Sequence, residues 1–95
     1  MNWEQKSEMC KYFNEEQYDK ALDIVIENID SMDEQSWDMF FIGIELTTES
    51  IKPFIDKHKI ICDKTKNEET SSFRTAIRMA NYEMLVKEIT EIING

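Results

Sequence analysis

The residues most suited to chemistry in this chain are one histidine and two cysteines. His58 and Cys62 stand four positions apart, so on a helix they would share one face with the spacing of two metal ligands. Cys10 would supply a third ligand if the first helix packed against them. His58 and Cys62 also fall on an otherwise apolar helical stripe, which favours a core thiol and a partly buried imidazole. We therefore expect no bound metal.

Other catalytic patterns are missing from the sequence. The chain has two glycines, one of them the last residue, which leaves no glycine-rich loop for a phosphate. No serine or cysteine stands in the context of a nucleophile elbow. Acidic residues are plentiful, but they follow polar helix faces, where nothing would tune a pair of them for acid and base work. We therefore expect no enzymatic activity and no cofactor.

Charge is distributed very unevenly along the chain. Residues 1–50 carry thirteen acidic residues against three lysines, a net charge of −10, whereas residues 51–95 carry seven acids against eight bases, a net of +1. Repulsion among so many like charges costs stability. Such an imbalance therefore favours an external reason, either solubility or a basic partner.

An acidic row follows the second predicted helix and continues into the third. Its members recur mostly at steps of three or four residues and oppose an apolar stripe, so neighbours are expected about 5–6 Å apart on the solvent side. The acidic row consists of Glu16, Asp19, Asp23, Glu27, Asp30, Asp33, Glu34 and Asp38. Only Lys20 interrupts it. The row predicts a binding surface for a basic partner, and a merely solubilising face is the alternative.

The spacing of apolar residues predicts helices throughout. The first helix is short, with an apolar face of Trp3, Met9, Cys10, Tyr12 and Phe13. Asn14 ends it and, with Gln17, predicts a capping box for the second helix, which Phe13 and Tyr18 would accompany as a hydrophobic staple. The second helix has the clearest stripe, made of Tyr18, Ala21, Leu22, Val25, Ile26 and Ile29.

A third helix is expected after a turn at residues 30–33, with Ser31 and Glu34 as its capping box. Its inner face would carry Trp37, Phe40, Phe41, Ile44 and Thr48. Met39, Ile42 and Leu46 lie on the opposite side, so this segment is apolar almost all round and predicts a central, buried helix. A buried strand is the alternative, and Gly43 would let a neighbour approach closely.

The second half of the chain predicts two more helices. Ser50 and Pro53 mark the start of one, whose stripe includes His58 and Cys62. Residues 63–72 contain no apolar residue and predict an exposed polar loop. The last helix is expected from about Phe73 to Ile93, with its inward face made of Phe73, Ile77, Ala80, Met84, Leu85, Ile89 and Ile92.

These patterns predict an all-α fold, a compact bundle of four to five antiparallel helices in a single domain over residues 1–95. No stretch reaches 18 apolar residues, so no membrane span is expected. The segment Met-Asn-Trp-Glu-Gln-Lys lacks the basic and apolar regions of a secretory signal. With two thiols predicted to be buried and free, we expect a cytoplasmic protein.

Trp3 and Trp37 are separated by 34 residues, the period of a tetratricopeptide repeat. With Tyr12, Tyr18 and Ala21 near the expected positions, residues 2–29 resemble one helical hairpin of that family. The second copy departs from the pattern, because Pro53 and Phe54 stand where its tyrosine and alanine should be. The resemblance therefore implies a helical hairpin and not a repeat array.

Size, acidity and the lack of catalytic residues make the chain similar in type to small acidic proteins that neutralise nuclease toxins, and to phage inhibitors of host nucleic-acid enzymes. The expected function is an inhibitor that occludes the active or nucleic-acid-binding site of a basic protein. The alternative is an adaptor or regulatory subunit whose helical-hairpin groove docks a partner helix.

Direct nucleic-acid binding is disfavoured, because the acidic half would repel phosphate. A basic end does exist, formed by Lys57, Lys59, Lys64, Lys66, Arg74 and Arg78, but acids are mixed in among them. If the acidic row is not the interface, the next candidate is the third helix around Met39, Ile42 and Leu46.

Overall fold

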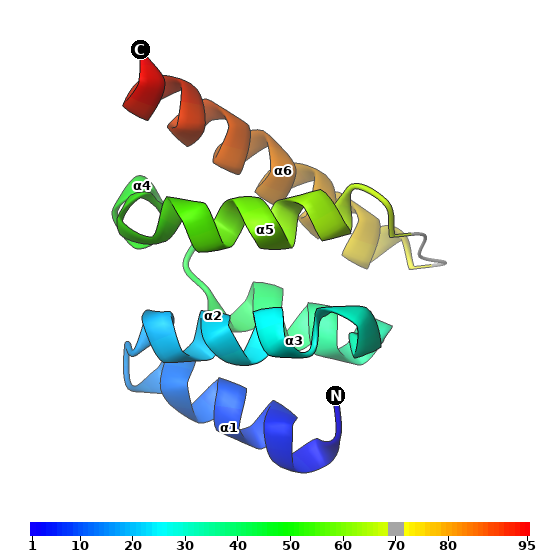
Figure 1. Ribbon diagram of the computed structural model, residues 1–95. Helices are drawn as coiled ribbons and strands as arrows, with labels where there is room; N and C mark the ends of the chain where they lie inside the picture. The colour runs from blue at the N-terminus through cyan, green and yellow to red at the C-terminus, as the bar shows by residue number, and fades with distance from the viewer. Residues whose placement is uncertain (69–71) are drawn as a thin grey trace. The chain divides into compact units, whose positions relative to one another are not determined.

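The computed structural model confirms the all-α prediction (Figure 1). It describes residues 1–68 and 72–95, and within these ranges every regular element is a helix. Five helices in the described ranges have ten residues or more. The chain divides into two compact units, Met1–Glu45 and Leu46–Gly95, which we call unit 1 and unit 2. The single domain expected over residues 1–95 stays a prediction.

Unit 1 is built on its first helix. The elements are α1 (Trp3–Asn14), α2 (Tyr18–Glu27), the 3₁₀ turn η1 (Ile29–Ser31) and α3 (Glu34–Gly43). Helix α1 packs against both α2 and α3. The unit's core is aromatic: the ring centroid of Phe40 lies 5.9 Å from that of Phe13, 6.0 Å from Trp37 and 5.2 Å from Phe41. Such tilted ring pairs add to the free energy gained by burial alone.

The stripe predicted for the second helix is confirmed, since Ala21, Leu22 and Val25 are fully buried. Both predicted capping boxes are wrong. Helix α2 begins at Tyr18 and its N-cap residue, Gln17, makes no side-chain cap. The chain first turns through Glu16, whose φ of 59° lies in the left-handed region, so Asn14 stays the last residue of α1. The rings of Phe13 and Tyr18 still meet, at 6.2 Å.

At the third helix, Asp33 takes the N-cap position predicted for Ser31, and it accepts a hydrogen bond from the backbone N–H of Ser36 at 2.9 Å. The genuine capping box of unit 1 joins Asn2 and Gln5 at the start of α1. Both caps use a side-chain oxygen three residues before the amide that it satisfies. Neither of these two caps was predicted from the sequence.

The prediction of a third helix buried all round is also wrong. Helix α3 ends at Gly43, so Leu46 and Thr48 lie beyond it, and Ile42 is 67 % exposed. Trp37, Phe40 and Phe41 are buried as expected. The predicted role of Gly43 is confirmed, because a Cβ atom placed there would stand 2.6 Å from Cδ2 of Phe13. Within the described ranges no strand replaces this segment.

Unit 2 consists of α4 (Thr48–Ile51), the 3₁₀ turn η2 (Lys52–Phe54), α5 (Ile55–Thr65) and the long helix α6 (Phe73–Asn94). Helix α6 packs against both α5 and α4. The start is earlier than predicted: Thr47 is the N-cap of α4, and its hydroxyl accepts from the backbone N–H of Ser50. Pro53 stands in the 3₁₀ turn, where its missing N–H costs little.

The polar segment predicted as a loop over residues 63–72 is shorter than that. Helix α5 continues through residues 63–65 because Thr65 is only 2 % exposed and its hydroxyl donates to the Cys62 carbonyl oxygen at 2.9 Å. Ser72 caps α6. The remaining part of this prediction, at residues 69–71, lies outside the described residues.

The extent of the last helix is confirmed, but its predicted inward face is largely wrong. Phe73 is 80 % exposed, Ile77 44 % and Met84 60 %. Of the predicted inward residues only Ile89 is fully buried. The buried face is instead made of Thr75, Met79, Tyr82, Val86 and Ile89. These positions recur at steps of four and three, which is one continuous face of a helix.

Among the described residues, no helix combines the length and the apolar character needed to cross a membrane.

Candidate functional site

The acidic row is carried mainly by α2, whose two faces have opposite roles. Ala21, Leu22 and Val25 are fully buried and fix the helix in unit 1, whereas Asp19, Asp23 and Glu27 are exposed. Each of these three acids stands four residues from the next, so they lie on one line along the helix surface. The core residues hold that line rigidly, because the buried face of α2 allows little rotation.

The remaining members of the row flank this line. Glu16 lies in the turn before α2, Asp30 in η1, and Glu34 in the first turn of α3; all three are exposed. Asp38 is half-buried. The structure thus brings Asp19, Asp23 and Glu27 together on one helix and distributes the other members of the row over the adjoining elements.

Asp33 has a structural role within unit 1 in addition to its place in the acidic row. It accepts from the hydroxyl and the backbone N–H of Ser36 and forms an ion pair of 3.1 Å with Lys6. The Ser36 hydroxyl above all, together with the Ser36 amide and Lys6, lowers the pKa of Asp33 to about 2. Lys6 is 6 % exposed and also donates to Gln35 at 2.9 Å. Asp33 therefore joins α1 to α3 in addition to carrying charge.

The local electrostatic field near the start of α2 is negative. Burial raises the pKa of the Tyr18 hydroxyl, and the carboxylates of Glu45 and Glu16 raise it further. Lys20, which interrupts the row, has its amine 5.6 Å from the ring centroid of Tyr12. A cation in that position is partly engaged by the aromatic face. It therefore offsets the neighbouring acids only locally.

The two units differ sharply in charge. Unit 1 contains twelve acidic residues and three lysines, a net charge of −9, while unit 2 contains eight acids and eight bases, a net of zero. The two values together give the −9 of the whole chain. The imbalance is thus confined to the unit that presents the acidic row.

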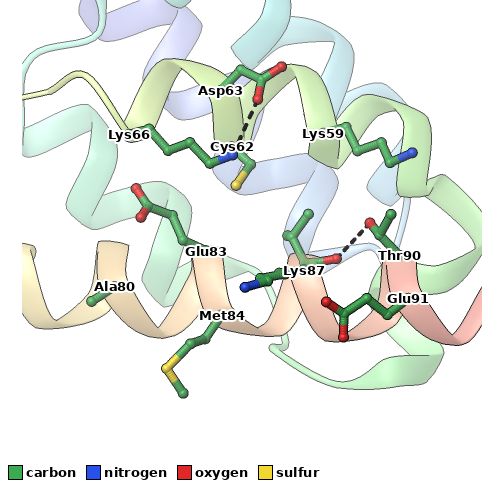
Figure 2. A pocket seen from close by; sticks show the side chains of 11 residues that line it. Lys59, Cys62, Asp63, Lys66, Ala80, Glu83, Met84, Lys87, Thr90 and Glu91 are labelled. Carbon is green, nitrogen blue, oxygen red and sulfur yellow. Dashed lines mark hydrogen bonds and ion pairs between the residues drawn. The ribbon is translucent and has the colours of Figure 1, made fainter.

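A groove between α5 and α6 in unit 2 is a second candidate, one that the sequence did not indicate (Figure 2). Its volume is 660 Å³. Its apolar lining residues are Cys62, Ala80, Met84 and Val86, and its charged lining residues are Lys59, Asp63, Lys66, Glu83, Lys87 and Glu91. The three positive and three negative charges balance, so the groove favours an occupant with an apolar face over a strongly charged one.

His58, whose spacing from Cys62 would also suit a metal ligand, is fully buried in unit 2. Nδ1 of His58 lies 2.9 Å from the hydroxyl of Tyr82, and that hydroxyl donates to the backbone carbonyl of His58 at 3.2 Å. Since the single Tyr82 proton goes to the carbonyl, His58 is the donor at Nδ1. Burial lowers the pKa of His58 to about 4, so the imidazole is neutral at pH 7.

Both thiols are unsuited to nucleophilic chemistry. Cys62 is 4 % exposed, Cys10 is half-buried, and neither forms a disulfide. Burial is the main cause that raises the pKa of each thiol, so both are protonated and weakly reactive at neutral pH. Within residues 1–68 and 72–95, no cluster of three or more histidine, cysteine or acidic residues is arranged to hold a metal ion.

Neither a family model, nor a characterised protein sequence, nor a solved structure matches this chain. We therefore infer function from the chain's own residues.

Proposed function

We propose that the protein acts by stoichiometric binding and not by turnover, with the acidic row as its contact surface. The partner is a basic protein whose active or nucleic-acid-binding site the row covers, as a toxin immunity protein or a phage-encoded inhibitor would. The observation that supports this most is the line of Asp19, Asp23 and Glu27, exposed on a helix whose opposite face is fully buried. Carboxylates held at fixed spacing complement arginine and lysine side chains and accelerate encounter by electrostatic steering.

The test reverses the central line of the acidic row. The triple variant D19K/D23K/E27K should fold normally, because the three residues are exposed and the buried stripe of α2 is untouched. Binding to the basic partner should be lost, because three favourable contacts become three repulsive ones. Each would cost about 1–3 kcal/mol if it is desolvated at the interface, and much less at the rim.

The matched control makes the same change of charge in the same unit. Glu4, Glu8 and Glu15 are exposed at or next to α1, outside the acidic row, and the variant E4K/E8K/E15K should bind nearly as well as the wild type. Partners captured from host extract by the wild type are compared with those captured by each variant. The identified partner is then assayed for complete inhibition at one equivalent.

Two results would contradict this proposal. If both triple variants capture the same partner equally, the acidic row is only a solvated face. If the association rate changes little between low and high salt, electrostatic steering does not drive the encounter.

The groove between α5 and α6 supports the second candidate, an adaptor that docks a partner helix. Its apolar lining residues and its balanced charges are features of helix-in-groove recognition. The variant Val86→Glu is unsuitable as a test because Val86 is buried in unit 2. Ala80→Glu, at an exposed position lining the groove, should abolish binding of an adaptor's target and leave the acidic-row interaction intact.

A further inference from the structure

Helix α6 carries a second apolar face opposite its buried one. Phe73, Ile77, Ala80 and Met84 recur at steps of four, three and four and are all exposed; we call them the α6 seam. The buried face of the same helix recurs at Thr75, Met79, Tyr82, Val86 and Ile89. At about 100° per residue the two faces lie on opposite sides of α6. A large exposed apolar seam at this spacing is typical of a helix that packs against another helix.

The charges of α6 are complementary end to end. Residues 73–82 contain Arg74 and Arg78 and no acid, a net charge of +2. Residues 83–94 contain three glutamates and Lys87, a net charge of −2. A second copy of this helix running antiparallel would place each basic half beside an acidic half. A parallel copy would place like charges together, which is unfavourable.

Two of these charges flank the seam on the same side. Arg74 and Glu88 are both exposed and lie about four helical turns apart. Neither forms an ion pair within the part of the chain that the structure describes. Because an antiparallel pair brings equivalent flanks together, Arg74 of one copy would face Glu88 of the other, twice by symmetry. Ala80 then lies near the crossing point, where its small side chain permits close approach.

We propose that the protein forms an antiparallel homodimer through the α6 seam. Ile77 of one copy packs beside Met84 of the other, and the reciprocal Arg74–Glu88 pairs fix the direction. Ala80 and Met84 also line the groove between α5 and α6 (Figure 2), so the second helix lies along its edge. A seam of this length buries a small area, and the dimer is therefore weak and concentration-dependent. This inference is independent of the acidic row, which lies in unit 1.

The experiment measures the mass of the full-length chain by sedimentation equilibrium between about 10 μM and 1 mM, a range that covers weak interfaces. The wild type should pass from monomer to dimer across this range. The variant I77E/M84E should dimerise at least about tenfold more weakly, with an unchanged helical signal in circular dichroism. Ile42→Glu, at an exposed apolar position of α3, is the matched control and should dimerise as the wild type does.

The direction of the pair is tested by exchanging charges, which leaves the apolar residues unchanged. Arg74→Glu and Glu88→Arg should each weaken the dimer, and R74E/E88R should restore it. A wild type that is monomeric throughout overturns the proposal, as does an I77E/M84E variant that dimerises normally. Failure of the double exchange to restore association overturns the antiparallel arrangement. If unit 1 or another protein covered the α6 seam, the wild type would be monomeric throughout this range.

Discussion

Unit 1 and unit 2 differ in net charge and in the residues that make up their cores. Unit 1 has a net charge of −9 around a core of aromatic rings. Unit 2 is neutral, with surface pairs such as Lys64–Glu68 at 3.4 Å, and its core contains a hydrogen-bonded histidine and tyrosine. In unit 2 the acidic and basic side chains neutralise one another. In unit 1 the negative charge exceeds the positive charge, and this excess is the main reason to expect a basic partner there.

The aromatic core should make unit 1 sensitive to a single truncation. Phe40 is fully buried and contacts three other rings, so Phe40→Ala should cost about 3–5 kcal/mol of unfolding free energy. Ile42→Ala, two residues further on but 67 % exposed, should cost less than about 0.5 kcal/mol. Urea denaturation followed by tryptophan fluorescence measures both, because Trp3 and Trp37 both lie in unit 1. Similar costs for the two variants would contradict the described burial of α3.

Acid should affect the two units in different pH windows. Burial lowers the pKa of His58 in unit 2 to about 4, below its ordinary value of 6.5. Between pH 6.5 and 4 the imidazole of His58 is therefore protonated in the unfolded chain but not in the folded one. The free energy of unfolding is highest above pH 6.5 and decreases as the pH falls towards 4. The total loss is about 3 kcal/mol. In unit 1, Asp33 has its pKa lowered from 3.8 to about 2, so its contribution is lost only below pH 3.8.

An acid titration followed by two signals tests this order. Far-UV circular dichroism reports helices of both units, and tryptophan fluorescence reports unit 1. The dichroism change should begin at the higher pH. His58→Gln, which cannot titrate, should flatten the stability profile between pH 6.5 and 4. Coincident transitions would instead show that the two units unfold together, as a single domain over residues 1–95 requires.

Replacing Gly43 with alanine should have a smaller effect on stability, and one of opposite sign to the usual effect of this substitution in a helix. Alanine at an exposed glycine within a helix stabilises it by up to about 1 kcal/mol. At Gly43 the added Cβ would meet Cδ2 of Phe13 at 2.6 Å, so the ring or α1 must shift. Gly43→Ala should therefore destabilise unit 1 by about 1–3 kcal/mol. Thermal unfolding monitored by tryptophan fluorescence measures the change, and a raised melting temperature would contradict the close approach.

The sequence predicted the helices well and their inward faces unevenly. In α2 the apolar residues occupy a single stripe, so Ala21, Leu22 and Val25 were assigned correctly. Helix α6 has apolar residues on two opposite faces, and periodicity cannot choose between them. The structure buries the face that includes Tyr82, whose hydroxyl is hydrogen-bonded to His58. That partner is 24 residues away in the sequence, beyond the reach of any local pattern.

The candidate site was also predictable only where it depends on local helix periodicity. The line of Asp19, Asp23 and Glu27 needs only helix periodicity and is exposed as expected. The separate role of Asp33 depends on Lys6, which comes from another helix. The groove between α5 and α6 depends on how two helices pack, which sequence spacing does not specify.

The smallest expected effect comes from the same substitution, aspartate to lysine, made in each of the two units. Asp23 stands four residues from both Asp19 and Glu27 and three residues after Lys20, so Asp23→Lys replaces two like-charge pairs with opposite-charge pairs and one opposite-charge pair with a like-charge pair, a net gain. It should stabilise unit 1 by a few tenths of a kcal/mol, about 0.2–0.5 for each pair.

Asp56 is also exposed, but it stands four residues after Lys52 and three before Lys59, in the first turn of α5. Asp56→Lys should therefore destabilise unit 2 by a similar amount, since it creates repulsion and loses a favourable charge at a helix start. Urea denaturation of both variants at low salt and at 1 M salt, where charges are screened over about 3 Å, measures the difference. Effects of the same sign, or effects that persist at high salt, would show that the charge imbalance between the units does not govern their surface energetics.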